Sequence, residues 1–375
     1  MAKMDVIWDG YGLGNPHSGV YRYAAGLLGE ISELGVKPQI IQAQSNVPPD
    51  LSENAQIISM ASKGLLRKVT RAKVVWPQKV GRILRSKRSE FGDKVIYHGL
   101  CNSNIPYGKG FHKDYATVLT MLDIIPLLPE AGVSSLARAQ MSRYLPLILP
   151  KVDRITCISQ WSKDTLLERF PYLADRTTVS LCGFPKMEPK GDGRVHQEGR
   201  PVSLLMVSRF EHYKNFRLLG DVVLALKDKG RLILVTDEVG KRFMTENFGP
   251  LLKSGGIEAL CGVGQAELKD LYNNSDVYVQ TSRYEGFCLP ASEALSHRVP
   301  VVFQMGSGID EVVGSQMGVG IEFGQSPARW AEVILETARL ARDGHYLDEA
   351  ENFVGSRATW GQAARDLNSL YRELL

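Results

Sequence analysis

Two glutamates eight residues apart follow a short apolar run in the second half of the chain. The stretch SRYEGFCLPASEAL (282–295) places Glu285 in a loop and Glu293 inside the helix that we expect to follow it. A carboxylate accepts two hydrogen bonds from neighbouring hydroxyls, which suits the diol of a sugar or a ribose. We expect backbone N–H groups to point into the same space, namely those of Gly286, Phe287 and Cys288. Taken alone, this spacing arises readily by chance, and one surface glutamate plus one helix-face glutamate is the alternative.

Two cations follow an earlier apolar run. The residues SLLMVS (203–208) lead into RFEHYKNF, so Arg209 stands where a strand would end and Lys214 stands just before a predicted helix. A helix N-terminus offers free N–H groups and partial positive charge. Arginine binds phosphate oxygens through two parallel N–H groups, and lysine adds a point charge. The pattern therefore indicates a diphosphate site, with two solvated surface cations as the alternative.

Both pairs of residues need a scaffold that brings several strand ends together. Short apolar runs alternate with helical patterns in both halves of the chain, at 4–8, 95–98, 115–122, 154–159, 177–182, 203–208, 231–236, 276–281 and 299–303. This alternation predicts an α/β protein with parallel sheets covered by helices. Ligands of such sheets bind beyond the carboxyl ends of the strands. Two sheets of this kind, facing each other, would form a cleft.

The composition changes once along the chain. The segment KMEPKGDGRVHQEGRP (186–201) is polar, rich in Gly and Pro, and without apolar periodicity, which is typical of a linker. We therefore expect four parts: an N-terminal Rossmann-like domain at 1–186, a linker at 187–200, a C-terminal Rossmann-like domain at 201–357 and an amphipathic C-terminal helix at 358–375.

Composition excludes several classes of protein. The 375 residues carry a net charge of +4, a smaller excess than nucleic-acid binders usually show, so we expect no nucleic-acid partner. Five cysteines without CxxC spacing argue against a disulfide framework or a zinc site and favour a reducing cytoplasm. The N-terminus lacks the apolar core of a signal peptide, and no stretch is long and apolar enough to cross a membrane.

The ordered set VSRFEHYKNF, LYNNSDVYVQTSRYEGFCLPASEALSHRVPVV and GIDEVVG resembles a known family. The similarity is to the retaining nucleotide-sugar glycosyltransferases of family 4, in glycosyltransferase group 1, whose pattern includes E-G-F-G-L-P. Weaker similarity covers SGVYRYAAGLLGEI, VLTMLDIIPLLPE and ITCISQWSKDTLLERF in the first half. The resemblance implies the GT-B fold, with two Rossmann-like domains facing across a cleft and a C-terminal helix that crosses back to the N-terminal domain.

The resemblance also implies roles for individual residues. Arg209 and Lys214 would hold the donor diphosphate, Glu285 the hydroxyls of the transferred sugar and Glu293 the ribose diol. Asp123 would join them as a catalytic residue. The remaining residues implied in donor binding are Gly19, Val20, Ser282, Gly286, Phe287, Cys288 and Leu289. The family needs no metal and no cofactor, because cations and helix ends neutralise the leaving diphosphate; the absence of a D-x-D triplet is consistent with this.

The implied reaction is transfer of a sugar from a GDP- or UDP-type donor to an acceptor hydroxyl, with retention of configuration. The acceptor would be a glycan or a lipid-linked molecule, in the synthesis of a cell-surface polysaccharide or glycolipid. A protein of the same fold that binds nucleotide sugars without turning them over is the alternative. A thermal-shift panel of nucleotide sugars, combined with activity measurements, distinguishes a transferase from a protein that only binds.

One departure from the family pattern bears on the donor. Where the family has His-Asp, this chain has Leu122 and Asp123. The family histidine touches the sugar, often near its 6-hydroxyl, so an apolar Leu122 suggests a donor that lacks this hydroxyl, such as a 6-deoxy sugar or a pentose. The alternative is a shifted loop in which His98 or His112 takes over, with an ordinary mannosyl or glucosyl donor. A second departure is Arg298, which replaces a usual glycine.

A basic stretch lies between residues 63 and 88. It contains ten Lys or Arg residues, no acidic residue and interleaved apolar residues. Basic amphipathic helices of this kind lie on anionic membranes, so we expect a peripheral membrane contact on the cytoplasmic face. Helices of the N-terminal domain with a solvated basic face are the alternative.

Overall fold

The computed structural model describes residues 4–375 apart from 17, 43–50, 52–54, 60–75, 103, 107–110, 129, 189–198, 315 and 341–343. The chain divides into two compact units. Unit 1 comprises residues 1–127, 134–183 and 358–375, and unit 2 comprises residues 128–133 and 184–357. Most of the predicted linker and the basic residues 63–75 lie outside the described part of the chain.

Unit 1 contains a seven-stranded parallel sheet in the order β3-β2-β1-β4-β5-β6-β7. Its strands are β1 Asp5–Asp9, β2 Gln39–Gln42, β3 Gln56–Ser59, β4 Val95–Gly99, β5 Ala116–Met121, β6 Arg154–Cys157 and β7 Thr177–Val179. Its helices are α1 Gly19–Glu33, α4 Trp76–Ser86, α5 Phe111–Asp114, α6 Ser135–Ile148, α7 Gln160–Arg169 and α15 Trp360–Glu373.

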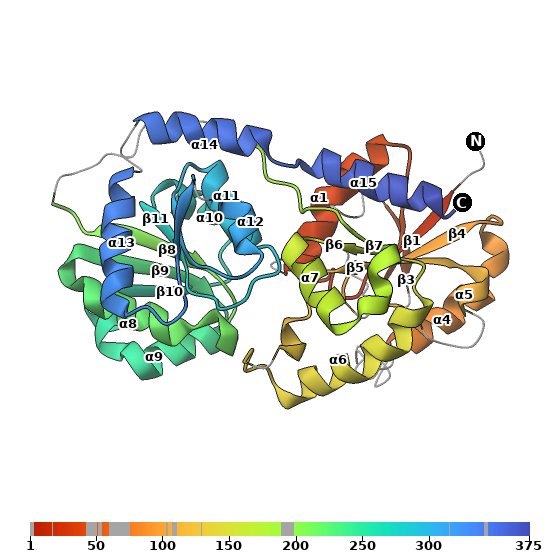
Figure 1. The fold of residues 1–375 in the computed structure, drawn as a ribbon, viewed down its shortest axis with the longest axis horizontal. Helices are drawn as coiled ribbons and strands as arrows, with labels where there is room; N and C mark the ends of the chain where they lie inside the picture. Colours follow the sequence, from red (N-terminus) through yellow and green to blue (C-terminus); the bar gives the residue numbers. More distant parts are fainter. Residues whose placement is uncertain are drawn as a thin grey trace. The chain divides into compact units, whose positions relative to one another are not determined.

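Unit 2 contains a six-stranded parallel sheet in the order β10-β9-β8-β11-β12-β13. Its strands are β8 Val202–Val207, β9 Gly230–Thr236, β10 Ile257–Cys261, β11 Val277–Gln280, β12 Val301–Gln304 and β13 Gly318–Ile321. Its helices are α8 Phe216–Leu226, α9 Glu238–Lys253, α10 Gln265–Asn273, α11 Leu289–Ser296, α12 Ile309–Val313, α13 Pro327–Leu340 and α14 Gly344–Ser356. In Figure 1, α8, α9 and α13 cover one face of this sheet, and α11 and α12 cover the other. The predicted doubly wound α/β architecture is confirmed in both units.

The central strands are buried along their whole length because helices cover both of their faces. In β11 every residue is buried, and the same holds for β4 and β12. The core of unit 2 packs β-branched and leucine side chains of the sheet against Phe216 of α8 and Trp330 of α13. This packing makes the sheet a rigid base for the loops at the carboxyl ends of its strands.

The C-terminal helix α15 packs against α1 within unit 1 (Figure 1). Its Tyr371 hydroxyl accepts a hydrogen bond from Trp8 Nε1 at 2.9 Å and lies 2.6 Å from His98 Nδ1. Gly183 and Gly26 leave room for the Trp360 ring, since a Cβ at either position would lie within 2.5 Å of it. The prediction that the C-terminal helix returns to the N-terminal domain is therefore confirmed.

His98 belongs to the interior of unit 1. It is fully buried in β4, and its second ring nitrogen, Nε2, lies 2.8 Å from Thr120 Oγ1. Both ring nitrogens thus have protein partners. The hypothesis that His98 replaces the family histidine at the site is wrong, because a histidine held at both nitrogens inside the sheet has no group left for a substrate. The side chain of His112, the other candidate, lies outside the described residues.

We expect His98 to make the fold sensitive to acid. Burial lowers the pKa of His98 to about 3, whereas the unfolded chain takes up the proton near 6.5. Stability should therefore fall as the pH drops from about 6.5 towards 3, by up to about 1.4 kcal/mol per pH unit for this one group. Urea unfolding at pH 7 and pH 5 should show a smaller acid loss for His98→Asn than for the wild type. Replacing the exposed His212 by Asn is the control, and equal acid losses in all three proteins would contradict the assignment.

Candidate active site

The candidate site lies where the strand order of unit 2 reverses. The chain runs from β8 outward through β9 to β10 and then returns to place β11 on the other side of β8. The loops that follow β8 and β11 therefore leave the same edge of the sheet next to each other. In open α/β sheets this switch point is where ligands bind. The β8 loop carries Arg209 and Lys214, and the β11 loop carries Glu285.

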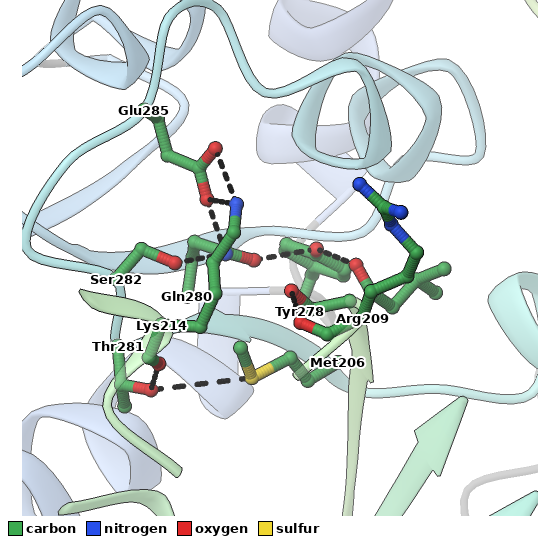
Figure 2. Close-up of polar contacts among 10 residues, drawn as sticks. Met206, Arg209, Lys214, Tyr278, Gln280, Thr281, Ser282 and Glu285 are labelled. Atoms are coloured by element: carbon green, nitrogen blue, oxygen red, sulfur yellow. Dashed lines mark hydrogen bonds and ion pairs between the residues drawn. The ribbon is translucent and has the colours of Figure 1, made fainter. Parts of the chain in front are cut away.

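Lys214 and Glu285 form a buried ion pair. The Lys214 ammonium lies 2.7 Å from Glu285 Oε1 and 2.8 Å from Oε2, with both side chains largely shielded from solvent. Burial alone lowers the pKa of Lys214, but the opposing charge of Glu285 and its hydrogen bond raise that pKa above its ordinary value. Lys214 therefore stays charged in the folded protein. The two residues that sequence reasoning assigned to different parts of a donor are in direct contact (Figure 2).

Backbone contacts hold the Lys214 loop in place. Asn215 adopts a left-handed conformation (φ 55°) and caps α8, accepting a hydrogen bond from Leu218 N–H with its side chain. The Thr281 hydroxyl donates to the Lys214 carbonyl at 3.0 Å. Arg283 N–H donates to the Tyr213 carbonyl at 2.7 Å. The loops after β8 and β11 are thus joined on both sides of the ion pair, which fixes its position.

Two further residues complete the network, and sequence reasoning missed both. Gln280 Nε2 donates to Glu285 Oε1 at 2.6 Å, and the Tyr278 hydroxyl donates to Gln280 Oε1 at 2.7 Å. Ser282, a predicted site residue, meets the same amide, with its Oγ 2.6 Å from Gln280 Nε2. Figure 2 shows this chain of contacts from Tyr278 to Lys214. The available signal was a glutamine at the end of an otherwise apolar strand, five residues before Glu285.

Arg209 is the exposed cation of the site. Its guanidinium forms no hydrogen bond or ion pair with any described residue, and Figure 2 draws it beside the network without a contact to it. Arg209 stands two residues beyond the end of β8, next to Ser208, whose N–H continues the sheet by donating to Val235 O at 2.9 Å. An arginine anchored by its backbone, with its guanidinium exposed to solvent, can bind an anion without first breaking an internal contact.

Glu293 lies on α11 as predicted, and its carboxylate is held by the protein. The residue is 9% exposed, and Tyr272 of α10 donates a hydrogen bond to its Oε2 at 2.9 Å. The Tyr272 ring stacks on His297 with a centroid distance of 5.2 Å and an interplanar angle of 18°. Tyr272 therefore sets the direction of the Glu293 carboxylate, and sequence reasoning did not identify it.

The turn from Gly286 to Leu289 leads into α11 at a strained residue. Cys288 has a φ of 76°, a conformation that costs a non-glycine residue about 1–2 kcal/mol. A glycine, which stands here in the family pattern, would adopt this φ without that cost. Gly308 allows the neighbouring loop to approach, since a Cβ there would lie 2.2 Å from the Gly286 carbonyl oxygen. Its N–H donates to the Glu285 carbonyl at 2.9 Å, which holds the backbone of the site.

Just after α11, Arg298 also stands where the family has glycine, and it also has a positive φ, of 57°. Its guanidinium compensates by binding Glu351 of α14 through Nε at 3.0 Å and the Glu188 carbonyl through Nη1 at 2.7 Å. A glycine could not make these contacts. The backbone strain at Arg298 is thus offset by contacts that connect α14 to Glu188, the last described residue before the gap at 189–198.

The predicted site residues of the first half belong to unit 1. Gly19 and Val20 form the first turn of α1, which Ser18 caps by accepting from Tyr21 N–H at 3.1 Å. Asp123 Oδ1 accepts from Ile125 N–H at 2.9 Å, which is the bond of a turn.

Leu122 is held at both ends of its peptide: its N–H donates to Asn102 Oδ1 at 2.7 Å, and its carbonyl accepts from the Ser162 hydroxyl at 2.8 Å. These two contacts fix the loop with a leucine at this position.

Of the predicted site residues, the structure brings Arg209, Lys214, Ser282 and Glu285 together in unit 2.

The described part of the basic stretch comprises α4 and the two residues that follow it, Lys87 and Arg88. Val80 and Leu84 are fully buried in the core of unit 1, while Arg82 and Arg85 are exposed. The expectation that these two apolar side chains face a membrane is wrong, because they pack against the sheet. In the described residues no helix is long and apolar enough to cross a membrane. The same residues contain no group of three His, Cys, Asp or Glu side chains arranged to hold a metal ion.

Residues 193–351 match the family model described as glycosyl transferases group 1. This part of the chain is a glycosyltransferase group 1 domain. It carries Arg209, Lys214, Glu285 and Glu293, so the network at the switch point lies inside the region that matches this family model.

Two curated relatives are similar at lower identity. An O-antigen chain mannosyltransferase B of Escherichia coli is 25% identical over 340 residues, with 83% of this chain and 85% of that protein aligned. A phosphatidylinositol N-acetylglucosaminyltransferase GPI3 subunit of Saccharomyces cerevisiae is 23% identical over 203 residues, covering 51% of this chain and 44% of that protein.

Solved structures match the whole chain in fold. A glycosyltransferase from Rickettsia africae has a TM-score of 0.73 at 16% identity, covering 100% of this chain and 99% of that one. Anabaena HepE in complex with UDP-glucose has a TM-score of 0.74 at 14% identity, covering 99% and 100%. At these identities the likeness concerns the fold alone, which is GT-B, as the resemblance implied.

The ion pair should contribute measurably to stability. In Lys214→Met the Glu285 carboxylate stays buried without its counter-charge, which should cost about 3–5 kcal/mol of unfolding free energy. In the double variant with Glu285→Gln the unpaired charge is gone, so much of this loss should be recovered. Urea unfolding of the wild type, both single variants and the double variant measures the coupling. Lys87→Met is the control, because its pair with Glu90 is exposed and should contribute at most about 0.5 kcal/mol. Additive effects at Lys214 and Glu285 would contradict the pairing.

Proposed function

We propose that this chain transfers a sugar from a nucleoside-diphosphate donor to an acceptor hydroxyl, with retention of configuration and without a metal. The single observation that carries the proposal is the Lys214–Glu285 pair at the switch point, with Arg209 exposed beside it. A diphosphate needs cations, and a sugar needs a fixed carboxylate. Both are present at one strand edge of a glycosyltransferase group 1 domain.

The residues divide the donor between them. Arg209 and Lys214 would hold the diphosphate and neutralise the charge that develops as it leaves. Glu285 would accept hydrogen bonds from the hydroxyls of the transferred sugar, and Glu293, held by Tyr272, those of the ribose. Donor binding would draw the Lys214 ammonium towards the phosphates, because the diphosphate carries more negative charge than the Glu285 carboxylate.

The step at the sugar needs no protein nucleophile. Retaining glycosidases use a second carboxylate for a covalent intermediate. In the reaction that we propose, the C1–oxygen bond to the diphosphate breaks and the acceptor oxygen bonds to C1 on the same face. The departing diphosphate oxygen takes the proton of the acceptor hydroxyl, so that atoms and charges balance. Gly19, Val20 and the backbone amides of Gly286 to Leu289 would line the donor site.

The donor sugar depends on the residue that replaces the family histidine. Leu122 is held by its backbone, and we take its apolar side chain to stand where the hydrogen-bonding side chain of the family would face the sugar. This supports a 6-deoxy sugar or a pentose. An ordinary hexose donor is the second candidate, favoured by the relative named as a mannosyltransferase and by the neighbour that binds UDP-glucose. Both GDP- and UDP-type donors fit the proposed diphosphate site.

The acceptor would be a glycan or a lipid-linked molecule, in cell-surface polysaccharide or glycolipid synthesis. Support comes from the similarity, over 83% of this chain, to a protein named for the O-antigen chain. The chain would work in the cytoplasm and meet the inner face of the membrane through the charges of its basic stretch. With Val80 and Leu84 buried, the described part of that contact would be electrostatic.

A thermal-shift panel of nucleotide sugars, followed by transfer assays with EDTA present, tests the proposal. A ligand that binds only the folded state raises the melting temperature by mass action. Glu285→Gln should reduce turnover by about 100-fold or more, as removing a transition-state contact does. Glu285→Gln should leave the binding of the free nucleoside diphosphate nearly unchanged. Glu293→Gln should weaken both turnover and the binding of the free nucleoside diphosphate. Glu258→Gln, at an exposed glutamate of the same unit, is the control. Binding of nucleotide sugars without any turnover, or inversion of the anomeric centre by NMR, would contradict the proposal.

The donor assignment has its own test. Leu122→His adds a hydrogen-bonding side chain, so the rate ratio of hexose to 6-deoxy donors should rise by about tenfold, the worth of one good hydrogen bond. Leu122→Met keeps the position apolar and should keep the wild-type ratio. The measurement is kcat/KM for matched donor pairs with the same nucleotide. A clear preference of the wild type for GDP-mannose or UDP-glucose would sink the 6-deoxy assignment.

A further inference from the structure

Gln280 is a deeply buried polar group of the site. It ends β11, is 1% exposed, and has every polar direction of its amide engaged. Its Nε2 donates to Glu285 Oε1 and to Ser282 Oγ, both at 2.6 Å, and its Oε1 accepts from the Tyr278 hydroxyl at 2.7 Å. Burying an amide is unfavourable unless it is hydrogen-bonded, so these contacts determine where Gln280 can point.

Tyr278 and Glu285 together decide which way the amide faces. Tyr278 is fully buried two residues earlier on the same strand. Burial, followed by the nearby negative groups, raises its pKa well above the ordinary value, so the phenol keeps its proton and stays a donor. A flipped amide would direct its NH₂ group at that hydroxyl and its carbonyl at the Glu285 carboxylate. The Tyr278 hydroxyl has a second acceptor in the Val207 carbonyl at 3.4 Å, but only the observed orientation supplies a donor to the glutamate.

The two partners of Glu285 differ in what a donor does to them. Lys214 carries a charge and would be shared with the incoming diphosphate. Gln280 is neutral, has no N–H left for phosphate, and is anchored at its other end by Tyr278. When the ammonium turns to the diphosphate, the contact with Gln280 is the one that persists at Glu285 Oε1.

We propose that Gln280 is a positioning residue that holds Glu285 Oε1 in place through donor binding and leaves Oε2 directed at the hydroxyls of the transferred sugar. This inference rests on the proposed function, because it takes Glu285 to be the sugar-binding carboxylate. Gln280 touches neither donor nor acceptor, and it acts only through Glu285. The hydrogen bonds from Tyr278 through Gln280 to Glu285 thus link the buried strand β11 to the orientation of the Glu285 carboxylate.

The decisive variant is Gln280→Glu, compared with Gln280→Met. The carboxyl group that Gln280→Glu introduces can donate to Glu285 while it is protonated, as the amide does, but it repels Glu285 once it is ionised. Two carboxylates that share a buried site raise the pKa of one of them. Gln280→Glu should therefore approach wild-type kcat at low pH and lose it as the pH rises. Gln280→Met has nearly the same volume and no donor, so its kcat should be at least about tenfold lower at every pH.

Further measurements separate positioning from packing. The dissociation constant of the free nucleoside diphosphate should stay within about twofold of wild type in both variants, because Arg209 and Lys214 remain. Gln304→Met changes another buried glutamine, at the end of the neighbouring strand β12, and should keep wild-type kcat and pH profile. Wild-type kcat in Gln280→Met would overturn the inference, as would a Gln280→Glu profile that matches that of Gln280→Met.

A substrate-free measurement distinguishes failure of this inference from failure of the proposed function. In Gln280→Glu the introduced carboxyl should have a higher pKa in the folded protein than in the unfolded chain. The stability of this variant relative to wild type should therefore be greatest below about pH 4.3, the unfolded value, and be lost as the pH rises through the folded pKa. Melting temperatures between pH 4 and pH 8 should show this loss. If they do while no nucleotide sugar is turned over by the wild type, the proposed function fails and the contact stands. If the difference in melting temperature is independent of pH, the Gln280–Glu285 contact is absent and the inference fails.

Discussion

The structure of unit 2 at its carboxyl edge depends on one buried ion pair. Lys214 and Glu285 lie on different loops, and neither could be buried alone, because an isolated charge loses far more hydration than packing returns. Their contact therefore requires the β8 and β11 loops to meet. One neutral donor also binds the carboxylate, since Gln280 donates to Oε1. The Gly308 N–H holds the backbone carbonyl of Glu285. The Thr281 hydroxyl completes the joint by holding the Lys214 carbonyl.

Several residues around the site have strained backbone conformations. Asn215 and Cys288 both adopt left-handed conformations at the starts of helices α8 and α11, and Arg298 does so where α11 ends. Such residues persist only where surrounding contacts over-determine them, and they gather at functional sites. The rigid parallel sheet supplies that surrounding structure, while the hydrogen bond from Tyr272 gives the Glu293 carboxylate its direction. Unit 2 thus combines strained residues at the ends of its site helices with a rigid sheet beneath them.

Sequence patterns were sufficient for the parts of the protein that are local. Alternating apolar runs and helical patterns predicted two parallel-sheet units, and strand ends placed Arg209, Lys214 and Glu285 at one edge. Reasoning failed where a side chain's surroundings are set by distant elements. His98 looked available because a histidine near a strand end has no local sign of burial, yet Tyr371 from the far end of the chain holds it. Val80 and Leu84 looked free in a basic stretch because the sheet that covers them lies elsewhere in the sequence.

By itself, then, the sequence determined the fold class, the order of the elements and the types of residue at the switch point, since periodicity and turn chemistry act over a few positions. Only the tertiary structure decided that Lys214 meets Glu285 across 71 residues, and that Tyr272 directs Glu293. It also decided that Gln280 faces the site and that His98 faces the core. The physical reason is the same in each case. Which strand ends become neighbours depends on the packing of the whole sheet, and a buried polar group takes the partner that this packing leaves within reach.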